Sequence, residues 1–226
     1  MSEYIGAKNL EVMDCAVNYN AYLASMVIKH ALLSDRILDF GAGIGTFTNV
    51  LRNKGFDICC VESDPDQLLR ITNNGVPGFL DIESCQDQFD YIFTLNVLEH
   101  IEDDQKTISQ FSKKIKQGGR LLIYVPAFQI LYSSMDRAVG HHRRYLIKDL
   151  SPKLLLAGFE IQKAQYVDSV GFFASLFYKY FGNNHGSISV DSVKLYDRFV
   201  FPFSSMLDFL TNKIFGKNLL IVAVRT

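Results

Sequence analysis

The stretch from Arg36 to Thr48, R-I-L-D-F-G-A-G-I-G-T-F-T, decides the fold of this 226-residue chain. It opens with an apolar run typical of a buried strand, which contains one acid, Asp39. Three glycines then crowd a turn, where positive φ angles and close backbone approach favour a residue without a Cβ. The apolar residues that follow have helical spacing and end at Gly55. The stretch therefore predicts a strand, a glycine turn, and a helix whose first N–H groups point toward the glycines.

The glycine spacing separates two classes of cofactor. Gly41, Gly43 and Gly45 form G-x-G-x-G, whereas the dinucleotide fingerprint is G-x-G-x-x-G. A carboxylate at Asp39 would repel a pyrophosphate but can bind an ammonium group. The sequence D-F-G-A-G-I-G resembles motif I of the class I S-adenosylmethionine-dependent methyltransferases. The resemblance implies that these residues, with Ala42 between the glycines, bind S-adenosylmethionine and that S-adenosylhomocysteine is the product.

Two further blocks extend the resemblance. F-D-Y-I-F-T-L-N-V-L-E-H-I, residues 89–101, resembles motif IV, and K-Q-G-G-R-L-L-I-Y-V-P, residues 116–126, resembles the fifth strand of the family. The implied fold is α/β: a Rossmann-like, seven-stranded, mostly parallel sheet of order 3-2-1-4-5-7-6. Its last strand is antiparallel, and helices cover both faces. We expect one methyltransferase domain over 1–226, with a substrate loop at 127–146 and an aromatic-rich helical insertion at 168–217.

Individual helices can also be placed. Apolar spacing predicts helices over residues 17–33 and 148–157. A polar helix is expected over residues 103–116, before the glycine pair at 118–119. Leu33 and Leu155 are expected among the side chains that these helices turn inward.

The ends of the predicted strands supply further cofactor candidates. Glu62 ends the second apolar run about twenty residues after the first glycine, where an acid can accept both ribose hydroxyls. It can also share helix capping with Asp64. The resemblance implies additional contacts from Tyr19, Ser63, Asp81, Ile82, Leu95 and Asn96. An exposed turn at Asp81 and core or rim packing of Tyr19 are the alternatives that the sequence leaves open.

The segment after the fifth strand is dense in polar groups. Its M-D-R-A-V-G-H-H-R-R-Y run, residues 135–145, is similar to a stretch in methyltransferases of saccharide assembly. His141 is the candidate general base, because histidine can take a proton near neutral pH, and Arg144 and Tyr145 are expected to orient the substrate. A solvated charged run is the alternative. At Glu99-His100, the resemblance implies a mainly structural helix opening, although the pair could also serve as acid and base.

Composition limits the partners. The net charge is −1, so there is no basic excess for binding nucleic acid. The four cysteines lack the spacing of a metal site, which predicts reduced thiols, no metal and a cytoplasmic protein. Residues 1–10 lack the features of a signal peptide, and no apolar run approaches the ~20 residues of a membrane span.

The aromatic-rich insertion leaves four explanations. Ordinary burial over the sheet is favoured. The alternatives are a cap over the pocket, a dimer contact or a peripheral membrane contact through residues 168–215. For the whole chain, the prediction is a methyltransferase that moves a methyl group from S-adenosylmethionine to an oxygen or nitrogen. The acceptor is expected to be a small molecule, with anionic, sugar-linked or lipid-linked compounds as candidates. A nicotinamide-dependent reductase and a non-catalytic cofactor-binding scaffold are the alternative functions.

Overall fold

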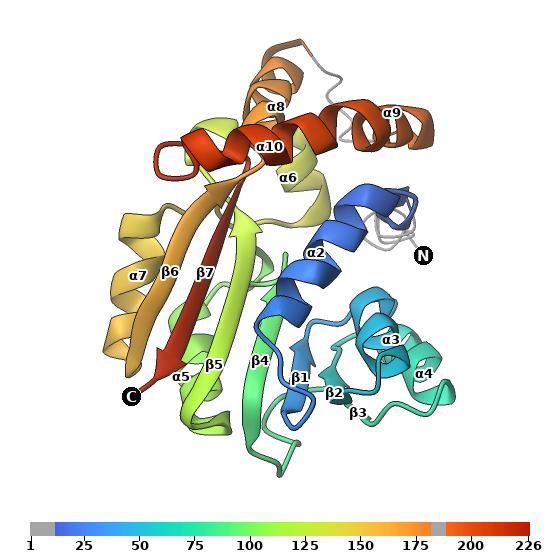
Figure 1. Ribbon diagram of the computed structural model, residues 1–226, viewed down its shortest axis with the longest axis vertical. Helices are drawn as coiled ribbons and strands as arrows, with labels where there is room; N and C mark the ends of the chain where they lie inside the picture. Colours follow the sequence, from blue (N-terminus) through green and yellow to red (C-terminus); the bar gives the residue numbers. More distant parts are fainter. Residues whose placement is uncertain (1–11, 182–188) are drawn as a thin grey trace.

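A computed structural model describes residues 12–181 and 189–226. One seven-stranded sheet runs through it in the order β3-β2-β1-β4-β5-β7-β6, with helices on both faces (Figure 1). β7 is antiparallel to both of its neighbours, and the other paired strands are parallel. The predicted fold class and strand order are confirmed. The strands are β1 (Arg36–Phe40), β2 (Asp57–Val61), β3 (Gly78–Phe79), β4 (Phe89–Leu95), β5 (Ile115–Pro126), β6 (Phe159–Val167) and β7 (Asn218–Arg225).

The core lies on both faces of the sheet because successive residues of a strand point to opposite sides. In β1, Ile37 packs with Val27 and Tyr91 in one apolar cluster, whereas Leu38 packs with Phe111 in the other. Each of these side chains is fully buried. This two-sided burial explains why β1 reads as a nearly continuous apolar run.

The helices divide between these two faces. α2 (Val17–Lys29) and α3 (Thr46–Asn53) contribute to the first cluster, whereas α5 (Asp104–Lys114) and α7 (Ile147–Leu156) contribute to the second. Two 3-10 turns, η1 (Leu98–His100) and η2 (Gln129–Leu131), follow β4 and β5. The α-helices before β6 are α2 (Val17–Lys29), α3 (Thr46–Asn53), α4 (Pro65–Asn73), α5 (Asp104–Lys114), α6 (Ser134–Val139) and α7 (Ile147–Leu156).

Three predicted helix features are corrected. α2 ends at Lys29 and leaves Leu33 70% exposed, because the Asp35 carboxylate accepts a hydrogen bond from the Leu32 N–H and closes a turn. α5 ends at Lys114, where the chain joins the sheet opposite β4. Leu155 is 58% exposed, because it lies about 100° around α7 from the buried Leu154.

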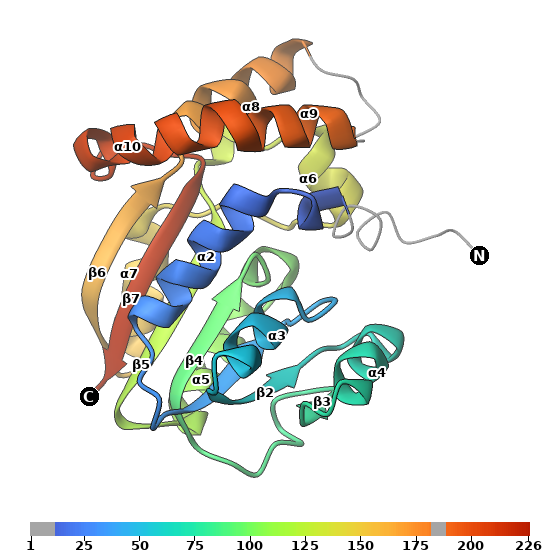
Figure 2. The same ribbon diagram turned by 45° about the vertical axis from the view of Figure 1, so that its right-hand side comes forward.

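The insertion between β6 and β7 forms a helical layer at one end of the sheet (Figures 1 and 2). It consists of α8 (Ser169–Phe181), α9 (Val190–Leu195), a π-helical turn (Tyr196–Val200) and α10 (Phe201–Thr211). Most of its large apolar side chains are exposed, so the favoured prediction of ordinary burial is wrong for them. In residues 12–181 and 189–226, no helix is both long and apolar enough to cross a membrane.

Candidate active site at the carboxyl edge of the sheet

Three strained residues mark one edge of the sheet. Asn96, Phe128 and Asp168 have φ angles of 56°, 60° and 64°. These angles lie in the left-handed region, where a backbone conformation costs a residue with a Cβ roughly 1–2 kcal/mol. They follow the carboxyl ends of β4, β5 and β6, respectively. Ligands of open α/β sheets bind at this edge, and backbone strain concentrates at functional sites. We therefore expect the functional site at this edge of the sheet.

The glycine turn and Glu62 meet at this edge. The N–H groups of Gly41 and Ala42 both donate to the Val61 carbonyl, which ties the turn to the end of β2. The Gly43 N–H donates to Oε2 of Glu62 at 2.7 Å. The Glu62 side chain thus lies against the glycine turn, and its contact with ribose hydroxyls stays a prediction. Ser63, the next residue, is exposed.

Packing as well as backbone angle requires glycine in this turn. Gly41 and Gly45 have φ angles of 80° and 84°. A Cβ on Gly41 would lie 2.3 Å from Cγ2 of Val97, and one on Gly45 would lie 2.9 Å from Cγ1 of Ile71. The turn therefore packs directly against the segment that follows β4 and against α4.

Asp39 is 3% exposed and accepts a hydrogen bond from Oγ1 of Thr48 at 2.6 Å. Burial raises the pKa of Asp39 to about 7, and the Glu62 charge adds to the effect. A cationic group near this carboxyl would favour its ionised form. Asp39 is therefore suited to respond to a bound ammonium group.

Tyr19 lies over the end of β5. Its hydroxyl is 3.4 Å from that of Tyr124, and its ring stands edge-on to Phe201 with centroids 5.2 Å apart. Leu95 is buried at the end of β4, and Asn96 is exposed immediately beyond it. The structure therefore places Tyr19 among aromatic side chains, as the packing alternative describes, and leaves Asn96 accessible.

Asp81 and Ile82 follow the carboxyl end of β3, the strand that pairs with β2. The exposed Asp81 carboxylate accepts hydrogen bonds from the N–H and Oγ of Ser84, at 2.7 and 2.8 Å. Ile82 is a core side chain, 3% exposed. The structure thus shows the turn contacts of Asp81, and the cofactor contacts of Asp81 and Ile82 stay predictions.

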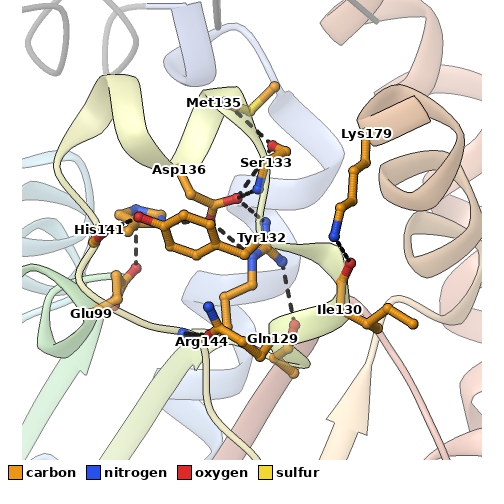
Figure 3. A network of polar contacts seen from close by, with 11 residues as sticks. Glu99, Gln129, Ile130, Tyr132, Ser133, Met135, Asp136, His141, Arg144 and Lys179 are labelled. Atoms are coloured by element: carbon orange, nitrogen blue, oxygen red, sulfur yellow. Dashed lines mark hydrogen bonds and ion pairs between the residues drawn. The ribbon is translucent and has the colours of Figure 1, made fainter. Parts of the chain in front are cut away.

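Asp136 is the hub of the loop after β5 (Figure 3). It is 1% exposed and accepts hydrogen bonds from the Ser133 N–H at 2.8 Å and from Nε and Nη2 of Arg144 at 2.8 and 3.1 Å. Its Oδ1 lies 2.8 Å from Nδ1 of His141. Burial alone would raise the pKa of Asp136, but the hydrogen bonds from His141 and Arg144 and the Arg144 charge outweigh it. They hold that pKa well below its ordinary value.

His141 faces a second carboxyl group. Its Nε2 lies 3.8 Å from Oε1 of Glu99, and its ring stands edge-on to His100 with centroids 4.6 Å apart. Glu99 is fully buried, and within the described part of the chain neither of its carboxyl oxygens has a hydrogen-bond partner. Burial raises the pKa of Glu99 to about 8. Burial and the neighbouring His141 lower the pKa of His100 to about 4.

Arg144 and Tyr145 do not reach the open edge as expected. The Arg144 side chain is 7% exposed and donates hydrogen bonds to Asp136 and to the Ala127 carbonyl. The Tyr145 hydroxyl is buried, 3.0 Å from the Leu98 carbonyl and 2.9 Å from Oδ2 of Asp104. The predicted substrate-orienting roles are corrected: both side chains hold the loop in place.

Sequence reasoning missed Asp136 and undervalued Glu99. The spacing D-x-x-x-G-H could have indicated Asp136. A short helix that ends at a glycine brings the residue after the glycine back beside the acid in the first turn of the helix. The ligand atoms of Glu99, His100 and His141 lie within 4.8 Å of one another, which suits proton transfer or a metal ion. The protonated carboxyl expected for Glu99 at neutral pH favours proton transfer.

Known proteins share this architecture. A sequence profile of the methyltransferase domain matches residues 18–164. An uncharacterized methyltransferase of Staphylococcus carnosus is 28% identical over 134 residues, which are 55% of this chain and 62% of that protein. The mitochondrial ubiquinone biosynthesis O-methyltransferase of Dictyostelium discoideum is 26% identical over 127 residues, 46% of this chain and 39% of that protein. The matches thus span less than two thirds of either curated relative.

A solved structure agrees with the fold along nearly the whole chain. The methyltransferase in a complex with the Haloferax volcanii Trm112 methyltransferase activator superposes with a TM-score of 0.64 at 13% identity, covering 96% of this chain and 93% of that one. The strand order, the glycine turn and the sequence profile all indicate a methyltransferase domain. This chain belongs to the methyltransferase domain family.

Proposed function

We propose that this chain transfers a methyl group from S-adenosylmethionine to an oxygen or nitrogen of a small anionic acceptor, including sugar- or lipid-linked ones. The observation that carries the proposal is the His141 imidazole, held by Asp136 and facing Glu99, on the loop that follows β5. It lies on the same edge of the sheet as the glycine turn. The proposed cofactor-binding residues and the proton-accepting imidazole therefore lie at the same edge of the sheet.

The residues present fit the cofactor. Glu62 offers a carboxylate beside the glycine turn for ribose hydroxyls, and Asp39 offers a carboxyl whose pKa of about 7 lets it ionise beside an ammonium group. Asn96 is exposed at the end of β4. Bound S-adenosylmethionine supplies a methyl group on a sulfonium, which reacts by in-line displacement. The protein's main task is then to position the acceptor atom.

His141 is the proposed general base. The low pKa of Asp136 keeps its carboxylate ionised, so it accepts a hydrogen bond and Nδ1 of His141 must carry the proton. This fixes the neutral tautomer that presents an unprotonated Nε2. Nε2 is then the atom that takes the proton from the acceptor.

Exposed cationic side chains support an anionic acceptor. Arg137 is exposed on the same loop, and Arg143, which pairs with Asp104, is partly exposed. Arginine can hold a carboxylate or phosphate with two hydrogen bonds. The name of the Dictyostelium discoideum relative, an O-methyltransferase, supports an oxygen as the acceptor atom. Family membership speaks against the alternative of a nicotinamide-dependent reductase.

An acceptor screen tests the proposal. Purified protein is incubated with S-adenosylmethionine and anionic sugars or lipids, and S-adenosylhomocysteine release is measured. With an accepted compound, His141→Gln should lower kcat by about 10²–10⁴-fold, whereas His142→Gln should leave it nearly unchanged. Equal turnover of wild type and His141→Gln would remove His141 as the base. Activity lost with EDTA and restored by a divalent cation would instead assign Glu99, His100 and His141 to a metal.

A further inference from the structure

The segment from α9 to α10 has its polar side turned toward the protein. Asp197, Phe201, Ser204 and Asp208 recur at spacings of four, three and four residues, and each is at most 8% exposed. Three of these four inward positions are polar. An ordinary surface helix places its apolar stripe inward, so this segment is reversed.

Hydrogen bonds fix this orientation. The Asp197 carboxylate accepts from the N–H groups of Asn18 and Tyr19, at 2.9 and 2.8 Å, in the first turn of α2. The Asp208 carboxylate accepts from the N–H groups of Asp168 and Ser169, both at 2.8 Å, where α8 begins. Each acid thus caps a neighbouring helix, where the unpaired N–H groups and the helix dipole favour a negative charge. The segment cannot rotate without leaving these groups unpaired.

The opposite side of the segment from α9 to α10 must therefore face outward. It carries Leu195, Phe199, Phe203, Met206 and Leu210, at spacings of four, four, three and four residues, which we call the outer stripe. These side chains are 54% to 73% exposed. The neighbouring α8, which packs against α10, exposes Phe173, Phe177 and Phe181. Apolar side chains that gather in this way on a surface indicate an interaction site.

The charges around the outer stripe identify its partner. Lys179, Lys194, Arg198 and Lys213 are exposed in this helical layer, whereas Asp191 is the only exposed acid among its described residues. The layer therefore presents an excess of three positive charges at its surface, on a chain with a net charge of −1. Two copies meeting through this face would oppose like charges. An anionic lipid surface would be complementary, and bulky apolar side chains flanked by lysine and arginine are typical of interfacial helices.

We propose that the outer stripe docks onto an anionic lipid bilayer, with the flanking cations on the headgroups. The layer joins β6 to β7 at the carboxyl edge of the sheet (Figure 2). Docking would hold that edge close to the membrane. The inference does not depend on the identity of the acceptor, and it concerns residues outside the cofactor and base sites.

Co-sedimentation with vesicles tests the inference. The full chain is mixed with phosphatidylcholine vesicles that contain phosphatidylglycerol, and with phosphatidylcholine vesicles alone. We expect saturable binding to the anionic vesicles and much weaker binding to the neutral ones. Phe203→Ser with Leu210→Ser should weaken binding at least about tenfold, given the apolar area withdrawn. Lys194→Glu with Arg198→Glu should weaken it by at least about fivefold per charge, with a smaller dependence on salt.

The controls distinguish binding through the outer stripe from nonspecific hydrophobic adsorption and from misfolding of a variant. Leu69→Ser and Leu156→Ser remove apolar side chains that are 57% and 80% exposed on α4 and α7, and should not change vesicle binding. S-adenosylhomocysteine affinity and melting temperature should stay the same in every variant. Failure of the wild type to bind anionic vesicles would overturn the inference. A second result would also overturn it. In that case the wild type does not bind vesicles, and light scattering shows a dimer that the outer-stripe substitutions convert to monomer.

Discussion

Nδ1 of His141 lies 2.8 Å from Oδ1 of Asp136, a carboxylate that is 1% exposed. The same carboxylate accepts hydrogen bonds from Arg144 and from the N-terminus of α6. One buried acid therefore sets the tautomer of the imidazole and the shape of the loop around it.

Asp136→Asn should lower both activity and stability. The amide cannot keep His141 in the required tautomer, so kcat should fall by about 10²-fold or more while KM changes little. The loss of its charge also leaves Arg144 buried without an ionic partner, which costs about 3–5 kcal/mol in other proteins. Steady-state kinetics and denaturant unfolding measure the two effects. Asp149→Asn, on an exposed acid of α7, is the control. A variant with wild-type kcat would exclude the positioning role of Asp136.

Glu62→Gln should weaken S-adenosylhomocysteine binding by about 10-fold to 100-fold, because a hydrogen bond to a charged group contributes about 1.5–3 kcal/mol. Asp64→Ala is the matched control, because the Asp64 carboxylate caps α4, where it accepts hydrogen bonds from the N–H groups of Asp66 and Gln67 and from Nε2 of Gln67. It should cost about 1 kcal/mol of stability and leave affinity unchanged. Calorimetric titration and thermal melting distinguish the two. Equal affinities of the two variants would contradict the assigned role of Glu62.

Tyr145→Phe should behave as a core variant. It removes the hydroxyl from Asp104 and from the Leu98 carbonyl, which should cost about 1–3 kcal/mol of unfolding free energy. Turnover should stay within about twofold, because the loop keeps its other contacts. The readouts are urea unfolding and KM for the acceptor. A large rise in KM at unchanged stability would restore the substrate-orienting role predicted from the sequence.

Glu99 should make stability depend on pH. Its pKa is raised to about 8 in the folded protein, against about 4.3 in the unfolded chain, so folding favours the protonated form. The benefit is fully present below about pH 4 and is lost as the pH rises toward about 8. Relative to wild type, Glu99→Gln should therefore gain unfolding free energy over this interval, by at most about 5 kcal/mol. Urea unfolding of both proteins across this range measures the difference. A constant difference would show that Glu99 is ionised in the folded state.

The cofactor half was predictable because its signals are local. The glycines of the turn, the apolar run of β1 and the acid that ends β2 lie within one strand-turn-helix-strand unit, and motif resemblance supplied the order of the sheet. The contact between Glu62 and Gly43 follows from that order, because β1 and β2 are parallel neighbours.

The substrate half was predicted only in part because its contacts are long-range. His141 was chosen for its chemistry, but its environment depends on Glu99, which lies in η1, after β4. The same holds for the helical layer. Its aromatic residues suggested burial, and nothing local shows that Asp197 and Asp208 turn inward to cap α2 and α8.

Calorimetric titration with S-adenosylhomocysteine, beside NADH, tests the central claim most directly. The wild-type chain should bind S-adenosylhomocysteine saturably with one site and should not bind NADH, and Glu62→Gln should show the weaker affinity described above. Binding of NADH alone, or of neither compound, would contradict a methyltransferase site at the carboxyl edge of this sheet. In the second case, the chain would be a scaffold that keeps the fold without its cofactor.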